Sequence, residues 1–136
     1  MSLETQAPIA RPAKGLLWTG RILSGLAALF LTFDGVTKIL KVAPVMEACR
    51  ELGLPDAVVP GIGAVLLACT VLYVIPATSV LGLVLLTGYM GGAVATHVRM
   101  NGPVFPVVFS TLFGVVLWLG LYLREPRLRA LLPLRR

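Results

Sequence analysis

Four long apolar blocks dominate the chain, and short polar or proline-containing segments separate them. The blocks cover residues of about 15–40, 58–75, 80–98 and 104–123. Each is close to the ~20 residues that an α-helix needs to cross about 30 Å of hydrocarbon. The pattern therefore predicts an all-α fold, a transmembrane four-helix bundle of up-down-up-down topology that occupies residues 15–123.

The longest connection, residues 41–57, predicts a short helix between the first two spans. Pro44 suits a helix start, and apolar residues then recur at helical spacing until Gly53 and Pro55 end the segment. The other faces are charged, so the helix is amphipathic and lies on the membrane or caps the bundle. The charged residues of these faces are Glu47, Arg50 and Glu51. The two glutamates either reach into a site or, as is more usual, are solvated.

The composition agrees with a membrane protein. Of the 136 residues, 57% are hydrophobic and 13% are charged, whereas soluble chains carry roughly a quarter charged residues. The net charge of +6 does not indicate nucleic-acid binding, because the basic residues flank apolar blocks instead of forming a stripe with aromatic side chains. The expected partners are membrane lipids, with a protein partner or a homo-oligomer left open.

Basic residues beside the spans predict the topology. Residues 1–14 contain Arg11 and Lys14 and are expected to form a short mobile tail, and residues 124–136 form a second tail with five arginines. The connections on the opposite face carry fewer basic residues, partly offset by acidic ones that count little for topology. This distribution predicts that both termini lie in the cytoplasm.

Polar side chains collect at one end of the predicted bundle. In an up-down-up-down arrangement, the C-terminal ends of the first and third spans lie at the same membrane face. Asp34 and Lys38 are four residues apart, on one helix face of the first span. Ionisable groups near the hydrocarbon are costly and mark candidate sites. The candidates are His97 and Asp34 as catalytic groups, and Lys38, Arg99, Tyr89 and Asn101 as substrate-binding groups.

Each candidate also has a structural interpretation. Asp34 and Lys38 can neutralise each other at the membrane edge. His97, the only histidine of the chain, can anchor the third span at the interface or pack there. Tyr89 shares a helix face with Ala93 and Thr96, and this face suits either the polar head of a ligand or ordinary packing.

Other small and polar residues favour structural roles. In the second span, Thr70 can bond back to its own helix, and Tyr73 suits the interfacial aromatic belt. Gly88 and Gly92 form a G-x-x-x-G spacing, which lets helix backbones approach closely within one bundle or between chains.

The cysteines and the single histidine exclude several kinds of redox site. Cys49 falls in a connection and Cys69 in the middle of a span, so a disulfide between them is not expected. One histidine cannot ligate haem from both sides, and no cluster of metal-ligating residues is visible. We therefore predict no metal site.

Two patterns of the chain resemble the DoxX-like family of small bacterial membrane proteins. One is the F-x-G-x-x-K pattern of residues 33–38, and the other is the run GYMGGAVATHVR of residues 88–99. The resemblance extends over residues 16–123 and implies a four-helix membrane bundle, here in a bacterial cytoplasmic (inner) membrane. Some members of the wider group are similar to a subunit of a thiosulfate:quinone oxidoreductase, whereas many others have no known activity.

Two functional hypotheses follow from the polar end of the bundle. The first is a membrane subunit of a quinone-linked oxidoreductase, with a non-covalently bound quinone at the extracytoplasmic ends of the first and third spans. In it His97 moves protons near neutral pH. The second is a non-catalytic accessory, assembly or lipid-binding module whose polar contacts hold the helices together. A transporter is disfavoured, because neither an inverted repeat nor broken helices are visible.

Overall fold

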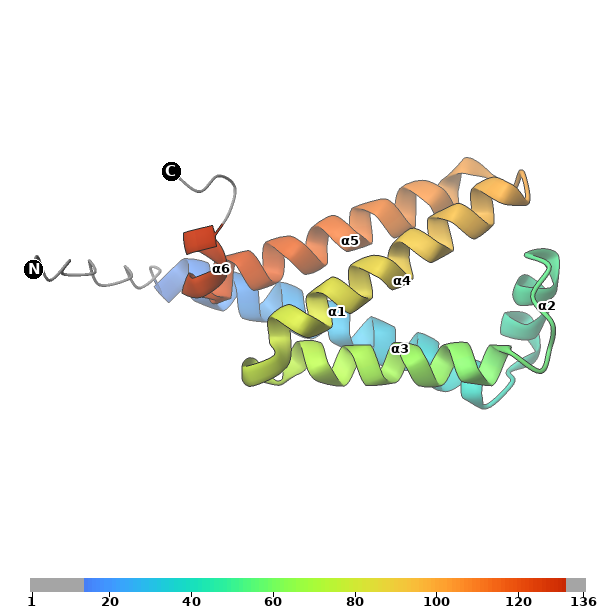
Figure 1. Ribbon diagram of the computed structural model, residues 1–136, viewed down its shortest axis with the longest axis horizontal. Coiled ribbons are helices and arrows are strands. Elements are labelled where there is room, and N and C mark those ends of the chain that lie inside the picture. The colour runs from blue at the N-terminus through green and yellow to red at the C-terminus, as the bar shows by residue number, and fades with distance from the viewer. Residues whose placement is uncertain (1–13, 132–136) are drawn as a thin grey trace, which may run out of the picture.

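The computed structural model describes residues 14–131, and all of their regular structure is helical (Figure 1). The predicted mobile tail of residues 1–14 lies outside the described residues except for Lys14, and residues 132–136 of the basic tail also lie outside them. The elements are α1 (Lys14–Ile39), α2 (Ala43–Glu51), α3 (Val59–Val74), η1 (Pro76–Thr78), α4 (Ser79–Arg99), α5 (Val104–Arg124) and α6 (Pro126–Leu131).

Three of the segments are long and apolar enough to cross a membrane. They are Lys14–Ile39, Pro76–Arg99 and Val104–Arg124. The helix in the predicted second span is equally apolar but has 16 residues, which at 1.5 Å per residue is about 24 Å, shorter than an average hydrocarbon core. By length, three of the four predicted spans are therefore supported.

The four long helices form two pairs that meet at one end. Helix α1 packs against α3 and α5, and α4 packs against the same two helices. Figure 1 shows the α1–α3 pair and the α4–α5 pair close together near α6, and diverging toward the end where α2 lies. We call these the closed end and the open end.

Glycines hold α1 and α3 together below the open end. A Cβ on Gly63 would lie 2.7 Å from the carbonyl oxygen of Gly35 and 2.8 Å from the Cβ of Lys38. Neither contact tolerates a larger residue, because real Cβ atoms do not approach other atoms so closely. The close approach of these backbones fixes the position of Lys38 along the α3 axis and its orientation relative to α3.

Tyr73 lies at the centre of the closed end, and its predicted place in the interfacial belt is wrong. Its side chain is 0% exposed. The hydroxyl donates a hydrogen bond of 2.8 Å to the carbonyl oxygen of Leu117 and lies 3.1 Å from Ser24 Oγ. A buried phenol requires such partners, and α1 and α5 supply them. Thr70, as predicted, bonds back to its own helix through the carbonyl oxygen of Leu66.

Two tail arginines complete the closed end. Arg124 donates a hydrogen bond of 2.9 Å to the backbone carbonyl of Tyr73, and its guanidinium lies 5.1 Å from the centre of the Tyr73 ring. Arg129 donates to the carbonyl oxygens of Tyr122 and Leu123, which belong to the last turn of α5 and have no partner within the helix. Both arginines therefore have a structural role in addition to any effect on topology.

The open end is built from three tight helix termini. Lys41, Gly53 and Asn101 follow α1, α2 and α4, and all three have positive φ. After α4, the amide of Asn101 bonds the carbonyl of Val98, and the amide of Gly102 bonds the carbonyl of His97. This is the Schellman pattern of helix termination, and α1 and α2 end in the same way.

Helix α2 lies at the open end (Figure 1), which fits one of the two predicted placements, and it begins and ends where the sequence indicates. Pro44 lies in its first turn, and Gly53 provides the left-handed residue after its last turn. Met46 and Cys49 are buried against Val59 of α3. The glutamates of this helix are exposed, so their solvated interpretation holds.

An exposed ion pair ties α2 to the loop before α3. Arg50 donates hydrogen bonds of 2.9 and 2.7 Å to the two carboxylate oxygens of Asp56. The bidentate contact holds the pKa of Asp56 below its usual range. A lowered folded-state pKa adds stability above the ordinary aspartate value of about 3.9, and this stability is lost as the pH falls through the folded-state pKa.

We therefore expect acid to loosen the loop of residues 52–58. Amide hydrogen exchange in this loop, corrected for its intrinsic pH dependence, should be faster at about pH 3 than at about pH 6. In Asp56→Asn the loop should exchange faster at the higher pH and show little further acid response. An equal acid response in both proteins would assign the effect to other carboxylates.

Candidate functional site

A cavity of about 460 Å³ lies between the diverging helix pairs at the open end. All five helices from α1 to α5 contribute to its walls. The lining residues are Phe30, Leu31, Asp34, Lys38, Cys49, Leu52, Leu54, Ile62, Tyr89, Met90, Gly92, Ala93, Thr96, His97, Phe109, Ser110 and Phe113. The divergence of α4 and α5 from α1 and α3 therefore leaves room for a small molecule beside the polar residues.

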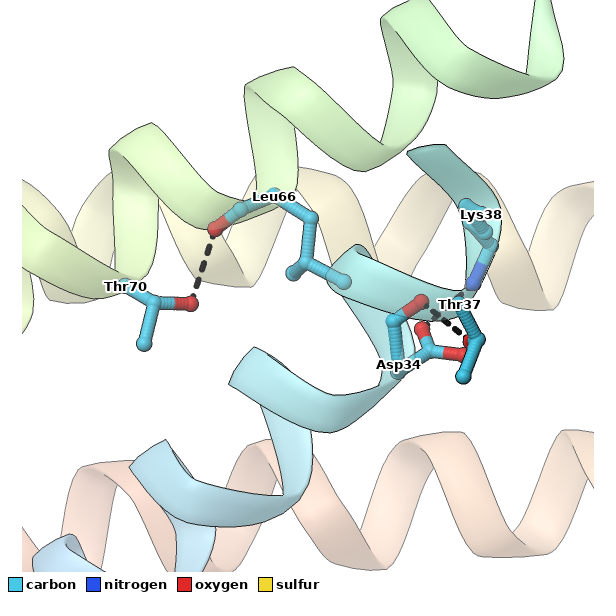
Figure 2. Close-up of polar contacts among 5 residues, drawn as sticks. All are labelled: Asp34, Thr37, Lys38, Leu66 and Thr70. Carbon is cyan, nitrogen blue, oxygen red and sulfur yellow. Dashed lines mark hydrogen bonds and ion pairs between the residues drawn. The ribbon is translucent and has the colours of Figure 1, made fainter. Parts of the chain in front are cut away.

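An ion pair on α1 forms one polar part of the wall. Figure 2 shows Asp34 and Lys38 on successive turns, with Lys38 Nζ 2.5 Å from Asp34 Oδ2. Their side chains are 34% and 14% exposed. Thr37 donates to the backbone carbonyl of Asp34. Pairing lowers the energetic cost of holding both charges near hydrocarbon. Their position on the cavity wall makes both side chains accessible to a ligand.

Helix α4 supplies the second polar part. Tyr89, Ala93, Thr96 and His97 follow one another at helical spacing and all line the cavity, as the shared helix face predicts. The Thr96 hydroxyl donates to the carbonyl oxygen of Gly92 in its own helix. By contrast, the Tyr89 hydroxyl and the His97 ring have no hydrogen-bond partner within residues 14–131.

Helix α5 adds a hydroxyl that the sequence did not single out. Ser110 lines the cavity, and its side chain also has no hydrogen-bond partner in the described part of the chain. From the sequence, Ser110 is one weakly polar residue of the fourth predicted span. Whether its side chain packs against a helix or faces a cavity depends on the rotation of α5 in the bundle.

The rest of the wall is apolar. Phe30, Phe109 and Phe113 form the side between α1 and α5, with the ring of Phe30 5.7 and 5.1 Å from those of Phe109 and Phe113. Cys49 contributes from α2. Burial raises the pKa of its thiol, so Cys49 is neutral at physiological pH and is not an activated nucleophile.

Four of the six predicted site residues line this cavity. They are Asp34, Lys38, Tyr89 and His97. Arg99 and Asn101 do not line it and are exposed. Asn101 instead supplies the left-handed backbone that ends α4. The sequence groups Tyr89, His97, Arg99 and Asn101 because all four lie in or just after the third span. The structure shows that only Tyr89 and His97 line the cavity.

The donor set indicates the chemistry that the cavity can hold. Within residues 14–131, no three His, Cys, Asp or Glu side chains come together as metal ligands. The polar groups on the wall are an ammonium, a carboxylate, an imidazole and three hydroxyls, one of which, on Thr96, donates to its own helix. Apolar walls with a few hydrogen-bonding groups suit a mainly apolar ligand with a carbonyl or hydroxyl head.

Comparison with known proteins agrees with the resemblance noted from the sequence. The family model described as "DoxX-like family" matches residues 22–120. This range includes every residue that lines the cavity. No curated protein and no solved structure matches the chain.

Proposed function

The chain belongs to the DoxX-like family, and we propose that it is a small multi-pass membrane protein. We further propose that its cavity binds the polar head of a lipophilic molecule. The observation that carries the proposal is the position of unpartnered Tyr89, His97 and Ser110 side chains on the wall that also holds the Asp34–Lys38 pair. All three side chains are partly buried, and their polar atoms are free to bond the head of a ligand in the cavity.

The proposed arrangement in the membrane has four spans. Helix α3 contacts both α1 and α4, which supports a position in the bilayer beside them. Its 16 residues are accommodated by local thinning or by snorkelling of flanking side chains. The arginines near the closed end support a cytoplasmic position for that end and for both termini. The cavity then lies near the opposite, extracytoplasmic face of the bacterial inner membrane.

The proposed ligand class is a lipid-soluble molecule with a carbonyl or hydroxyl head, of which a quinone is the redox-active example. Lys38, the Tyr89 hydroxyl and the Ser110 hydroxyl can donate hydrogen bonds to carbonyl oxygens. His97 is the proposed proton-transfer group, and Asp34 is the second candidate for that role. These roles suit the membrane subunit of a quinone-linked oxidoreductase.

A non-catalytic accessory module is the second candidate. The Asp34–Lys38 pair favours it, because two charges that already neutralise each other within α1 need no ligand to compensate them. The two candidates differ in their response to mutation. In the accessory module, substitutions in the cavity change stability without changing the binding of any head group.

Binding of a decyl-substituted benzoquinone to the protein in lipid nanodiscs tests the proposal. We expect Tyr89→Phe and His97→Ala each to weaken binding about 3- to 10-fold, the effect of losing one hydrogen bond to a ligand. Arg99→Ala is the matched control, since Arg99 ends the same helix but does not line the cavity. It should bind within about twofold of wild type.

Two results would contradict the proposal. Equal binding by wild type and all three variants would mean that the quinone only partitions into the lipid. The second is a mass-spectrometric measurement of wild-type protein extracted with its native lipids. If it finds neither a quinone nor any other small lipophile, the accessory module is favoured.

A further inference from the structure

A second hollow lies on the outer face of α1, next to the cavity. It has a volume of about 590 Å³ and is lined by Leu26, Leu29, Phe30, Thr32, Phe33 and Val36. We call it the α1 groove. Its one hydroxyl, on Thr32, donates to the carbonyl oxygen of Ala28 in the same helix. The groove therefore offers hydrocarbon contacts and no free hydrogen-bonding group from its side chains.

The groove faces outward, where a membrane would place lipid. Leu29 is 69% exposed and Phe33 is 70% exposed. Residues 26 to 36 span ten helical steps, about 15 Å along the axis. The groove is therefore long enough to hold an extended stretch of hydrocarbon chain against the helix.

Phe30 is the boundary between the groove and the cavity. It lines both, and its ring packs on Phe109 and Phe113 of α5. The boundary is thus made of aromatic side chains, two of which, Phe30 and Phe109, are 45% and 41% exposed. Exposed side chains change rotamer on fast timescales, whereas a boundary of helix backbone would need the bundle to separate.

Apolar groups line the side of the cavity next to α2. Cys49, Leu52 and Leu54 line it from α2 and the turn that follows. The side chain of Met100, after the last turn of α4, lies 3.5 Å from the position of a Cβ on Gly53, so the α2 turn and the end of α4 approach each other at the mouth. Entry past Phe30 requires side chains to move, whereas entry at this end must pass between the α2 turn and the end of α4.

We propose that the α1 groove holds the apolar tail of a single-chain amphipathic lipid whose head occupies the cavity, and that this lipid enters sideways from the membrane past Phe30. The inference rests on the proposed function for the head-binding site and adds the class of ligand and its route. Because Phe30 lines both hollows, one molecule can place its head in the cavity and its tail in the groove, whereas the head of an ordinary boundary lipid would stay at the membrane surface.

The test compares two probes in lipid nanodiscs, a benzoquinone without a tail and a benzoquinone with a decyl chain that ends in a photoreactive diazirine. After illumination, peptide mass spectrometry should find the tail mainly on residues 26–36. An excess of tail-less benzoquinone should displace that labelling. The variant Leu29→Ala/Phe33→Ala should bind the tailed probe about fivefold more weakly through loss of van der Waals contacts, with unchanged binding of the tail-less probe.

The matched control is Leu81→Ala/Val84→Ala, which alters two exposed apolar residues of α4 outside both hollows, and it should bind both probes like wild type. Tail labelling spread evenly over the exposed faces of α1, α4 and α5, with the tail-less probe still bound in the cavity, would overturn the groove and leave the head site standing. Failure of both probes to bind would overturn the proposed function and the groove together.

Discussion

Replacing Gly82 with alanine is expected to destabilise the protein by about 3 kcal/mol or more, although the change adds one methyl group. A Cβ at this position would meet the backbone of the α3 terminus, 2.5 Å from Tyr73 Cα, 2.6 Å from the carbonyl carbon of Leu72 and closer still to the Tyr73 nitrogen. Backbone atoms cannot rotate away as side-chain ends can, so α3 and α4 must separate.

The matched control for this change lies in the same helix. Gly91→Ala adds the same methyl group where no atom lies within 4 Å, and alanine is the better helix former by about 1 kcal/mol. Thermal unfolding in detergent, followed by circular dichroism, should show a large drop in melting temperature for Gly82→Ala and none for Gly91→Ala. Equal melting temperatures would mean that the α3–α4 contact does not limit stability.

The glycines illustrate what the sequence alone can and cannot predict. Gly88 and Gly92 have the spacing of a helix-packing motif, yet neither has an atom within 4 Å of a Cβ position inside the described chain. Gly82, which has no such motif, makes the tightest approach. Spacing along one helix marks a face that permits contact, but the crossing point depends on the length of the preceding turn and the tilt of the neighbouring helix.

The candidate site shows the same division. The order of the spans predicts that Asp34, Lys38 and His97 lie at one end of the bundle, and helical spacing puts Tyr89 on one face with Ala93 and Thr96; all of these residues line the cavity. The sequence did not separate them from Arg99 and Asn101. The rotation of each helix and the divergence of the two pairs depend on contacts between helices, such as that of Gly63 with Gly35, which spacing within one helix does not predict.

Tyr73 is the clearest case of a residue whose role depends on packing. A tyrosine near the end of an apolar helix suits the interface by its sequence position, because its ring is apolar and its hydroxyl polar. In the structure, Ser24 and Leu117 supply hydrogen-bond partners from two other helices, so the hydroxyl can be buried. Those partners lie more than forty residues away in either direction, so the sequence around Tyr73 does not predict its hydrogen bonds.

Removing the Tyr73 side chain should therefore be among the most damaging single changes in the protein. We expect Tyr73→Ala to cost about 3–5 kcal/mol of the free energy of unfolding, the range for losing a large buried aromatic side chain. Tyr73→Phe keeps the ring and loses the two hydrogen bonds, at a cost of about 1–2 kcal/mol. Both can be measured by denaturant unfolding in mixed micelles.

A double-mutant cycle separates the hydroxyl network from simple packing. Ser24→Ala and Tyr73→Phe should be non-additive, because each removes the same hydrogen bond, with a coupling of about 0.5 kcal/mol or more. Tyr89→Phe is the matched control, since it removes a tyrosine hydroxyl that has no partner within the described residues, and its unfolding free energy should stay close to that of wild type. A loss for Tyr89→Phe as large as that for Tyr73→Phe would show that phenol hydroxyls stabilise this bundle wherever they lie, and the closed end would lose its special role.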